Sequence, residues 1–415
     1  MSSSRRAFLG AATTLLVAGC SSDVLGLRRS VRIAVSWGGQ ELRAFHRVLD
    51  GLGTLDYPVE VVPLGDDIST AFGARSTRQP DIVMLPQPGL VPRHLGDLEP
   101  IPEDLAHLGR ARLWADLLVH DGTTYGVPFK TAHKSAVWYR PSVFREVGVQ
   151  PPRLWADWLT LNRSLSSAGI RPLSLAAGDG WVLTDFFENL LLGIAPAVYA
   201  GLATATNPRP SRQPDVAAAL RLLGTMWSAP GALAGGVKRS LVQQFPDAVI
   251  EVFGYRRAAM VLASDFAEPV VRSFAADPND IGLFTFPSVT PGALAPVVVG
   301  GDVMVLPKPT SDDARDLVRR LAAPTAPDPW IREGGFLVDG RVSGYSPELT
   351  LLAKQLAAPG GLLQFDLSDR LGRVGDINGL WRVLTDFLVR IGDRGSDVVP
   401  DAVDVAMTEL REVES

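Results

Sequence analysis

The chain contains one cysteine, Cys20, and five histidines among its 415 residues. With a single cysteine, the folded protein can hold neither an internal disulfide nor a thiolate zinc site, so packing must stabilise it. The histidines show no HxH or HExxH spacing, and the sequence has no GxSxG motif. These absences argue against zinc and serine hydrolases, and we expect no metal and no cofactor.

The sequence also lacks an excess of positive charge. Its 40 Lys and Arg residues stand against 45 Asp and Glu, for a formal charge of −5. Nucleic acid is therefore not an expected partner, because its phosphates require basic surfaces. No apolar run approaches the length of about 20 residues that a bilayer span requires. The length of the chain favours two domains.

The N-terminus combines export features. Residues 4–9 (SRRAFL) resemble a twin-arginine signal, and an uncharged segment ending in small residues leads to Cys20. We expect residues 1–19 to be a removable signal peptide, Cys20 to carry a lipid and residues 20–30 to form a tether. The protein would then be anchored to the outer face of the cell membrane. The arginine pair alone does not decide between twin-arginine and general export.

Strand and helix patterns alternate after the tether. Residues 31–35, 59–62 and 82–85 read as strands, and residues 41–52 repeat apolar side chains with the period of a helix. This order predicts a parallel α/β sheet. Ligands of such sheets bind beyond the carboxyl ends of the strands, so the loops that follow these strands are candidate binding positions. Residues 36–40 lack the spacing of a phosphate loop.

Trp181, Asp185 and Glu188 lie four and three residues apart, so they share one face if the segment is helical. An indole and two carboxylates suit a polyol, which needs a flat apolar surface and hydroxyl acceptors. The spacing fits equally well a helix cap at Asp185 with Trp181 in the core. Two carboxylates could also serve a glycoside hydrolase. Residues 296–306 read as two strands around a glycine turn.

Several motifs occur along the chain in a fixed order, and together they cover almost the whole mature sequence. They are Pro80–Val83 with Gly96–Ile101, Gly122–Phe129 with Ala136–Tyr139, Phe253–Met260, Ile281–Pro287, the Gly300–Gly301 turn, Trp330–Phe336 and Phe365–Asp369. In this order they resemble the extracellular solute-binding proteins of carbohydrate ABC importers, the family of the maltose-type binding proteins, in an actinobacterial form. One departure is an arginine, Arg256 or Arg257, where the family pattern has glycine.

The resemblance implies a two-lobed α/β protein of the type II periplasmic-binding-protein-like fold, whose discontinuous lobes close over a ligand. We expect an N-terminal lobe of residues 31–138 and 288–328 and a C-terminal lobe of residues 139–287 and 329–415. The resemblance further implies a monomer without enzyme activity that delivers a carbohydrate to the transmembrane subunits of an ABC permease.

The resemblance also implies binding roles in the cleft. The candidates are Trp37, Gln40, Glu41, Gln87, Lys130, Lys134, Trp181, Asp185, Glu188, Asp265, Gly300, Gly301, Asp302, Trp330 and Phe336. The glycines would let the backbone approach the ligand. The two lysines could face hydroxyls or a phosphate, or could be ordinary surface residues. Acids outnumber lysines in this set, which favours an amino sugar over a neutral disaccharide. A receptor for glycerophosphodiesters and a surface glycan hydrolase are the alternatives.

Overall fold

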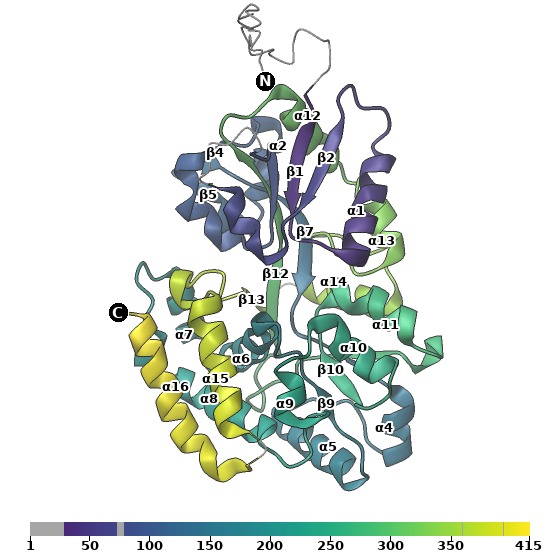
Figure 1. Ribbon diagram of the computed structural model, residues 1–415, viewed down its shortest axis with the longest axis vertical. Coiled ribbons are helices and arrows are strands. Elements are labelled where there is room, and N and C mark those ends of the chain that lie inside the picture. Colours follow the sequence, from purple (N-terminus) through teal and green to yellow (C-terminus); the bar gives the residue numbers. More distant parts are fainter. Residues whose placement is uncertain (1–28, 73–78, 359, 393) are drawn as a thin grey trace, which may run out of the picture.

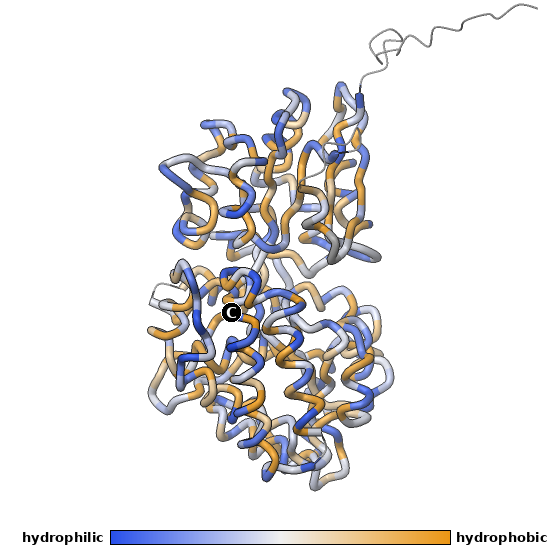
Figure 2. The backbone as a smooth tube through the Cα atoms, turned by 60° about the vertical axis from the view of Figure 1, so that its left-hand side comes forward, coloured by the Kyte–Doolittle hydropathy of each residue, from blue (hydrophilic) through white to orange (hydrophobic). Residues whose placement is uncertain are grey.

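The computed structural model describes residues 29–72, 79–358, 360–392 and 394–415. The expected signal peptide, the lipidation site at Cys20 and most of the tether lie outside these residues. The described chain forms two lobes joined at a narrow waist (Figures 1 and 2). Among the described helices, none is individually long and apolar enough to cross a membrane; α6 and α7 meet that test only as a pair bent by 119°.

The first lobe is built on a sheet of order β13-β12-β3-β1-β2, with β4 and β7 also paired to β12. β1 runs parallel to β2 and β3, as the sequence predicts, whereas β12 runs antiparallel to β3. The elements of this lobe are β1 (Val31–Val35), α1 (Gly39–Gly51), β2 (Val59–Pro63), η2 (Gly65–Ala71), β3 (Ile82–Leu85), η3 (Pro88–Arg93), η4 (Leu95–Asp97), β4 (Leu98–Glu99), α2 (Glu103–Gly109), α3 (Ala115–Leu118), β5 (Val119–His120), β6 (Thr123–Thr124), β7 (Val127–His133), β12 (Pro296–Pro307), α12 (Asp312–Leu321) and α13 (Asp328–Glu333).

The second lobe has a smaller sheet of order β11-β8-β10-β9, which is surrounded by helices (Figure 1). Its elements are β8 (Ala136–Tyr139), α4 (Pro141–Val147), α5 (Trp155–Ser167), β9 (Leu173–Ser174), α6 (Gly180–Ile194), α7 (Pro196–Thr204), η5 (Pro210–Arg212), α8 (Pro214–Trp227), α9 (Gly236–Ser240), α10 (Phe245–Phe253), β10 (Met260–Leu262), η6 (Asp265–Ala267), α11 (Glu268–Phe274), η7 (Pro278–Asp280), β11 (Gly282–Thr285), α14 (Pro347–Leu356), η8 (Gly372–Val374), η9 (Ile377–Trp381), α15 (Arg382–Ile391), η10 (Ser396–Val398) and α16 (Val399–Val413). The remaining strand, β13 (Leu362–Phe365), pairs with the start of β12.

β7 and β12 connect the lobes and pair with each other along the waist (Figure 1). β12 is one continuous, fully buried strand of 12 residues. The predicted strand-turn-strand at residues 296–306 is therefore wrong: the glycines fall inside a strand, where close packing requires them. The Cβ of an alanine at Gly301 would lie 2.2 Å from the carbonyl oxygen of Lys130, and Gly301 has φ +152°.

The lobes exchange chain at positions that differ in detail from the expected boundaries. β8 already belongs to the second sheet, so the first crossing lies between His133 and Ala136. Ser288 still bridges to Leu154 in the second lobe. α13 packs against α1 of the first lobe, and the chain returns to the second lobe only before α14. Hydrophobic spacing predicts where a helix lies in the sequence, but not against which of the two sheets the helix packs.

Candidate functional site

A cavity of about 400 Å³ opens between the lobes. The start of α1 provides Gln40 and Glu41, which follow the carboxyl end of β1 as the strand pattern predicts. The second lobe contributes Phe266 and the first residues of α11, and α13 with the loop after it closes a third side. The lining residues are Gln40, Glu41, Arg43, Ala44, Arg47, Phe266, Pro269, Arg272, Ser273, Trp330, Glu333, Gly334 and Gly335.

Lys130, on β7, lies beside this cavity and is almost fully buried. Its ammonium is 2.5 Å from Oε1 of Glu41 and lies over the rings of Phe266 and Trp330, 5.0 and 5.1 Å from their centroids. Burial acts to lower the pKa of Lys130, but Glu41, Asp302 and Asp265 together raise it above its usual value. Lys130 is thus a permanently charged group placed where the two lobes meet, and not a solvated surface lysine.

The carboxylates around Lys130 differ in their hydrogen bonding. Oδ1 of Asp265 accepts the backbone N–H of His133, whereas its buried Oδ2 has no hydrogen-bond partner among the described residues. Burial raises the pKa of Asp265 and of Asp302 to about 7 in each case, against the lowering effect of Lys130. Trp37 donates a hydrogen bond to Asp302. Burial therefore favours the protonated, neutral form of both acids.

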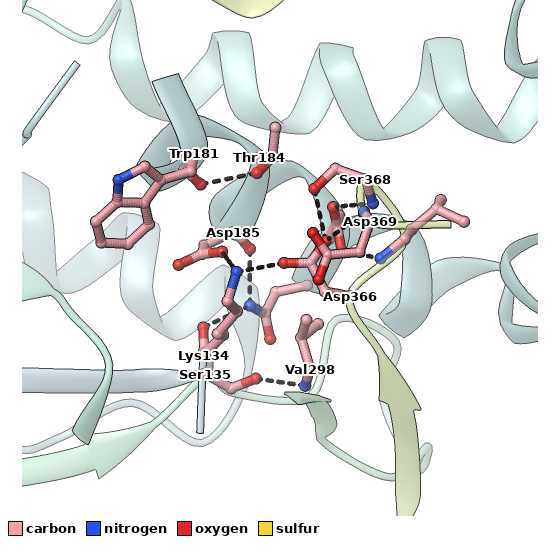
Figure 3. A network of polar contacts seen from close by, with 12 residues as sticks. Lys134, Ser135, Trp181, Thr184, Asp185, Val298, Asp366, Ser368 and Asp369 are labelled. Atoms are coloured by element: carbon pink, nitrogen blue, oxygen red, sulfur yellow. Dashed lines mark hydrogen bonds and ion pairs between the residues drawn. The ribbon is translucent and has the colours of Figure 1, made fainter. Parts of the chain in front are cut away.

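Lys134 forms the centre of a second cluster, shown in Figure 3. Its ammonium pairs with Asp366 and lies 3.4 Å from Oδ1 of Asp185, while the ring centroid of Trp181 is 5.9 Å away. Ser368 donates a hydrogen bond to Asp366. Phe266 connects the two lysine clusters. Its ring lies 5.8 Å from the ring of Trp181, and the ammonium of Lys130 lies over its face.

The pKa values of the acids in this second cluster are shifted in different directions. Burial raises the pKa of Asp185 to about 7 against the opposing charge of Lys134. Although burial disfavours its charge, Lys134 lowers the pKa of Asp366, which therefore stays ionised. Burial and the charge of Asp366 raise the pKa of Asp369 well above its usual value. Three carboxyl groups thus share one lysine.

Glu188 has a structural environment. Its carboxylate is fully buried and accepts hydrogen bonds from Tyr199 and from the backbone N–H groups of Leu367 and Ser368. The segment that carries Trp181, Asp185 and Glu188 is helical in α6, which is the condition under which their spacing places them on one face. The helix begins at Gly180 after Asp179, so the alternative of a cap at Asp185 is wrong. Glu188 fixes the segment that carries Asp366 rather than lining the cavity.

Other candidates are also built into the protein interior. Trp37, Trp330 and Phe336 pack with Phe129 in one aromatic cluster; the centroids of Trp37 and Trp330 are 5.0 Å apart. An added Cβ at Gly300 would lie 2.8 Å from the side chain of Lys134, so that glycine makes room for the lysine. Trp330 alone of the three aromatic candidates lines the cavity, and Gln87, at the carboxyl end of β3, does not.

Several residues of the arrangement were not individual candidates, among them Phe266, Ser273, Asp366 and Asp369. Phe266 follows Asp265 directly, and the aromatic neighbour of a cleft carboxylate is the signal that could have found it. Asp366 and Asp369 stand in the motif Phe365–Asp369, but only the fold brings that segment to Lys134. Within the described residues, no group of three or more His, Cys, Asp or Glu side chains could hold a metal ion.

Known proteins resemble this chain over most of its length. Residues 56–326 match the family described as bacterial extracellular solute-binding protein. The osmoprotective compounds-binding protein GgtB of Synechocystis sp. is 27% identical over 354 residues, which cover 80% of this chain and 82% of the relative. The alpha-glucosides-binding periplasmic protein AglE of Rhizobium meliloti is 26% identical over 363 residues, covering 80% and 76%.

Solved structures with the same fold include maltose-bound MalE3 of T. maritima, with a TM-score of 0.72, 19% identity and coverage of 92% of this chain and 100% of the other. The binding protein RafE in complex with raffinose gives a TM-score of 0.71 at 16% identity, covering 94% and 100%. These similarities confirm the expected two-lobed α/β architecture.

Proposed function

Because the chain belongs to the bacterial extracellular solute-binding proteins, we propose that it captures a sugar or oligosaccharide between its lobes and delivers it to the permease of an ABC importer. The observation that carries this proposal is the cavity between α1, η6–α11 and α13, in which Phe266 from one lobe faces Gln40 and Glu41 from the other. Its volume of about 400 Å³ is in the range of small-molecule sites.

The chemistry of this cavity suits a polyol. A pyranose ring presents an apolar C–H face to an aromatic side chain, and Phe266 offers such a face at the cavity wall. Its hydroxyls need acceptors and donors, which Glu41, Gln40 and Ser273 supply. The names of the curated relatives, which bind osmoprotective compounds and alpha-glucosides, support the same solute class.

Within this class, we propose that the ligand carries an amine. Lys130 is surrounded by Glu41, Asp265 and Asp302, and Lys134 by Asp185, Asp366 and Asp369. Six carboxyl groups surround two ammonium groups, and burial raises the pKa of four of them, so that their neutral forms are favoured while no cation is added. A cationic ligand would favour the ionised forms of these acids and pair with them. Because both lysines already pair with carboxylates, a glycerophosphodiester finds no uncompensated positive charge in either cluster.

The location follows the same proposal. We place the protein outside the cytoplasm, tethered through a lipid on Cys20, so that the binding lobes face both the solute and the permease. Its action is then capture and release: ligand stabilises the closed arrangement of the lobes, and the permease recognises that arrangement.

A binding panel tests the sugar assignment. The full chain should show a saturable increase in thermal stability with one sugar or oligosaccharide, and the sugar should be recovered unchanged. Ligand at 100 times its dissociation constant adds about 2.7 kcal/mol to the free energy of unfolding. We expect Phe266→Ala to weaken binding by about 10-fold or more, since an aromatic contact with its buried area contributes more than 1.4 kcal/mol. Phe274→Ala, which removes an exposed ring outside the cavity, is the control. Cleavage of the sugar would contradict the proposal.

The amine assignment has its own test. We expect Asp302→Asn to weaken binding of an amino sugar more than binding of its neutral counterpart, by about 10-fold if one charge-assisted contact is lost. Asp185→Asn should act in the same direction through the Lys134 cluster. Isothermal titration of both sugars with both variants measures the difference. Equal losses for the two sugars would reject an amine while leaving sugar capture intact.

A further inference from the structure

A second cavity, of about 510 Å³, lies on the second lobe and shares no lining residue with the interlobe cavity. Its lining residues lie in the loop after α5, in α9 and directly before it, in α10 and in the loop before β10. We call this cavity the arginine pocket, because four arginines line it: Arg171, Arg239, Arg256 and Arg257. One acid, Glu251, lines it as well.

Glu251 orients half of this pocket. Its side chain is 3% exposed, and its two oxygens lie 3.2 Å from Arg239 and 3.7 Å from Arg257. A buried carboxylate must be paired with positive charge to offset the cost of its desolvation. Glu251 therefore holds both guanidinium groups close to it, at the rim of the pocket. Four positive charges and one negative charge leave the pocket at +3, in a chain whose formal charge is −5.

The backbone is shaped around the same arginines. An added Cβ at Gly235 would lie 2.6 Å from the Cβ of Arg239, and one at Gly231 would lie 2.6 Å from Nη1 of Arg171. Arg256 adopts φ +56°, a left-handed conformation that disfavours every residue with a side chain. An arginine held where glycine is the unstrained choice indicates that its charge has a use.

The positive charges of Arg171 and Arg256 are not compensated by a neighbouring carboxylate within the described part of the chain. Both side chains are exposed, and neither has an ion-pair partner among the described residues. Guanidinium groups bind oxyanions through paired N–H donors, and phosphate groups offer the matching acceptors. We propose that the arginine pocket binds a multivalent phosphate anion, independently of the sugar. The concave shape fits a compact anion better than an extended acidic chain.

Pyrophosphate is the probe for this site. Isothermal titration of the full chain, at constant ionic strength, should give saturable binding that the presence of sugar does not change. Vesicles that contain phosphatidic acid, whose headgroup is a phosphate monoester, identify the source of the phosphate: retention that pyrophosphate competes away assigns a lipid headgroup, and pyrophosphate binding without retention assigns a free anion. Absence of both, or tighter binding of hexaglutamate than of pyrophosphate, would overturn the proposal.

Two variants and a matched control separate binding from folding. R171A/R256A should weaken pyrophosphate binding at least about 10-fold, as expected for the loss of charge-assisted contacts. R112A/R221A removes two exposed arginines elsewhere and should leave binding unchanged. Arg256→Gly should also weaken binding while folding at least as stably, because glycine accepts the left-handed backbone. Equal losses in the pocket variant and the control would show unspecific attraction and reject the site.

Discussion

At the scale of residues, the site depends on buried carboxyl groups that are difficult to ionise. Asp185, Asp265 and Asp302 each have a pKa of about 7 because burial outweighs the attraction of a lysine. The sequence predicted that acids and lysines would gather in the cleft. It could not predict these pKa values, because desolvation depends on the side chains that all other segments pack around a group.

These pKa values set the pH dependence of stability. A carboxyl group whose folded pKa is about 7, against an unfolded value of 3.8, binds more protons when folded, so its contribution to stability decreases as pH rises through that window. His133, whose folded pKa is lowered to about 4 by burial, acts in the opposite direction between that value and 6.5. The three carboxyl groups outnumber this one histidine.

We therefore expect the free energy of unfolding of the unliganded protein to fall between pH 5 and 7. Asp302→Asn should flatten this slope by up to about 1.4 kcal/mol per pH unit, the effect of one proton. Urea unfolding at several pH values measures the slope, and Asp404→Asn, at an exposed position, is the control. A slope unchanged by Asp302→Asn would contradict the assigned burial effect.

At the scale of elements, β12 joins the lobes. It also provides Gly301 and Asp302, which lie next to Lys130. Asp302 is paired with Lys130 of β7, and the register between the two strands shifts directly after this pair, between Asp302 and Val303. The sequence predicted strand structure on both sides of the glycines, with a turn between the strands. The continuity of the strand is decided by its partners, since β3, β7 and β13 pair with it along its length.

A side chain at Gly301 should disturb this junction. In Gly301→Ala, the new Cβ meets the carbonyl of Lys130 at 2.2 Å and the ring of Trp114 at 2.8 Å, and φ +152° is strained for alanine. We expect a loss of about 2–4 kcal/mol in unfolding free energy from overpacking and strain together. Gly96→Ala, where nothing lies within 4 Å of the new Cβ, is the matched control. Chemical denaturation measures the unfolding free energy of both variants. Similar losses in the two would contradict the expected clash at Gly301.

At the scale of the whole molecule, function depends on the relation between the lobes. β7 and β12 run through the waist (Figure 1). The cavity takes its walls from both lobes. A ligand that contacts Gln40 and Glu41 on one side and Phe266 on the other binds one arrangement of the lobes better than all others. It therefore shifts the population toward that arrangement.

Small-angle X-ray scattering measures this shift. We expect the radius of gyration to decrease on addition of a saturating sugar, with the same midpoint as the thermal stabilisation. Phe266→Ala should move both midpoints together to higher sugar concentration. A stabilising sugar that leaves the radius of gyration unchanged would contradict closure of the lobes while leaving binding intact.

The sequence alone determined the classes of element and the solute-binding family. Apolar periodicity is a local property, so α1 and the strands β1, β2 and β3 could be read from it, and the ordered motifs indicated two lobes around a cleft. Tertiary structure decided the contacts at long range. Asp366 meets Lys134 across 232 positions of the chain, and α13 joins the first lobe by packing on α1. No local pattern encodes such pairings, because burial and charge interact through space and not along the chain.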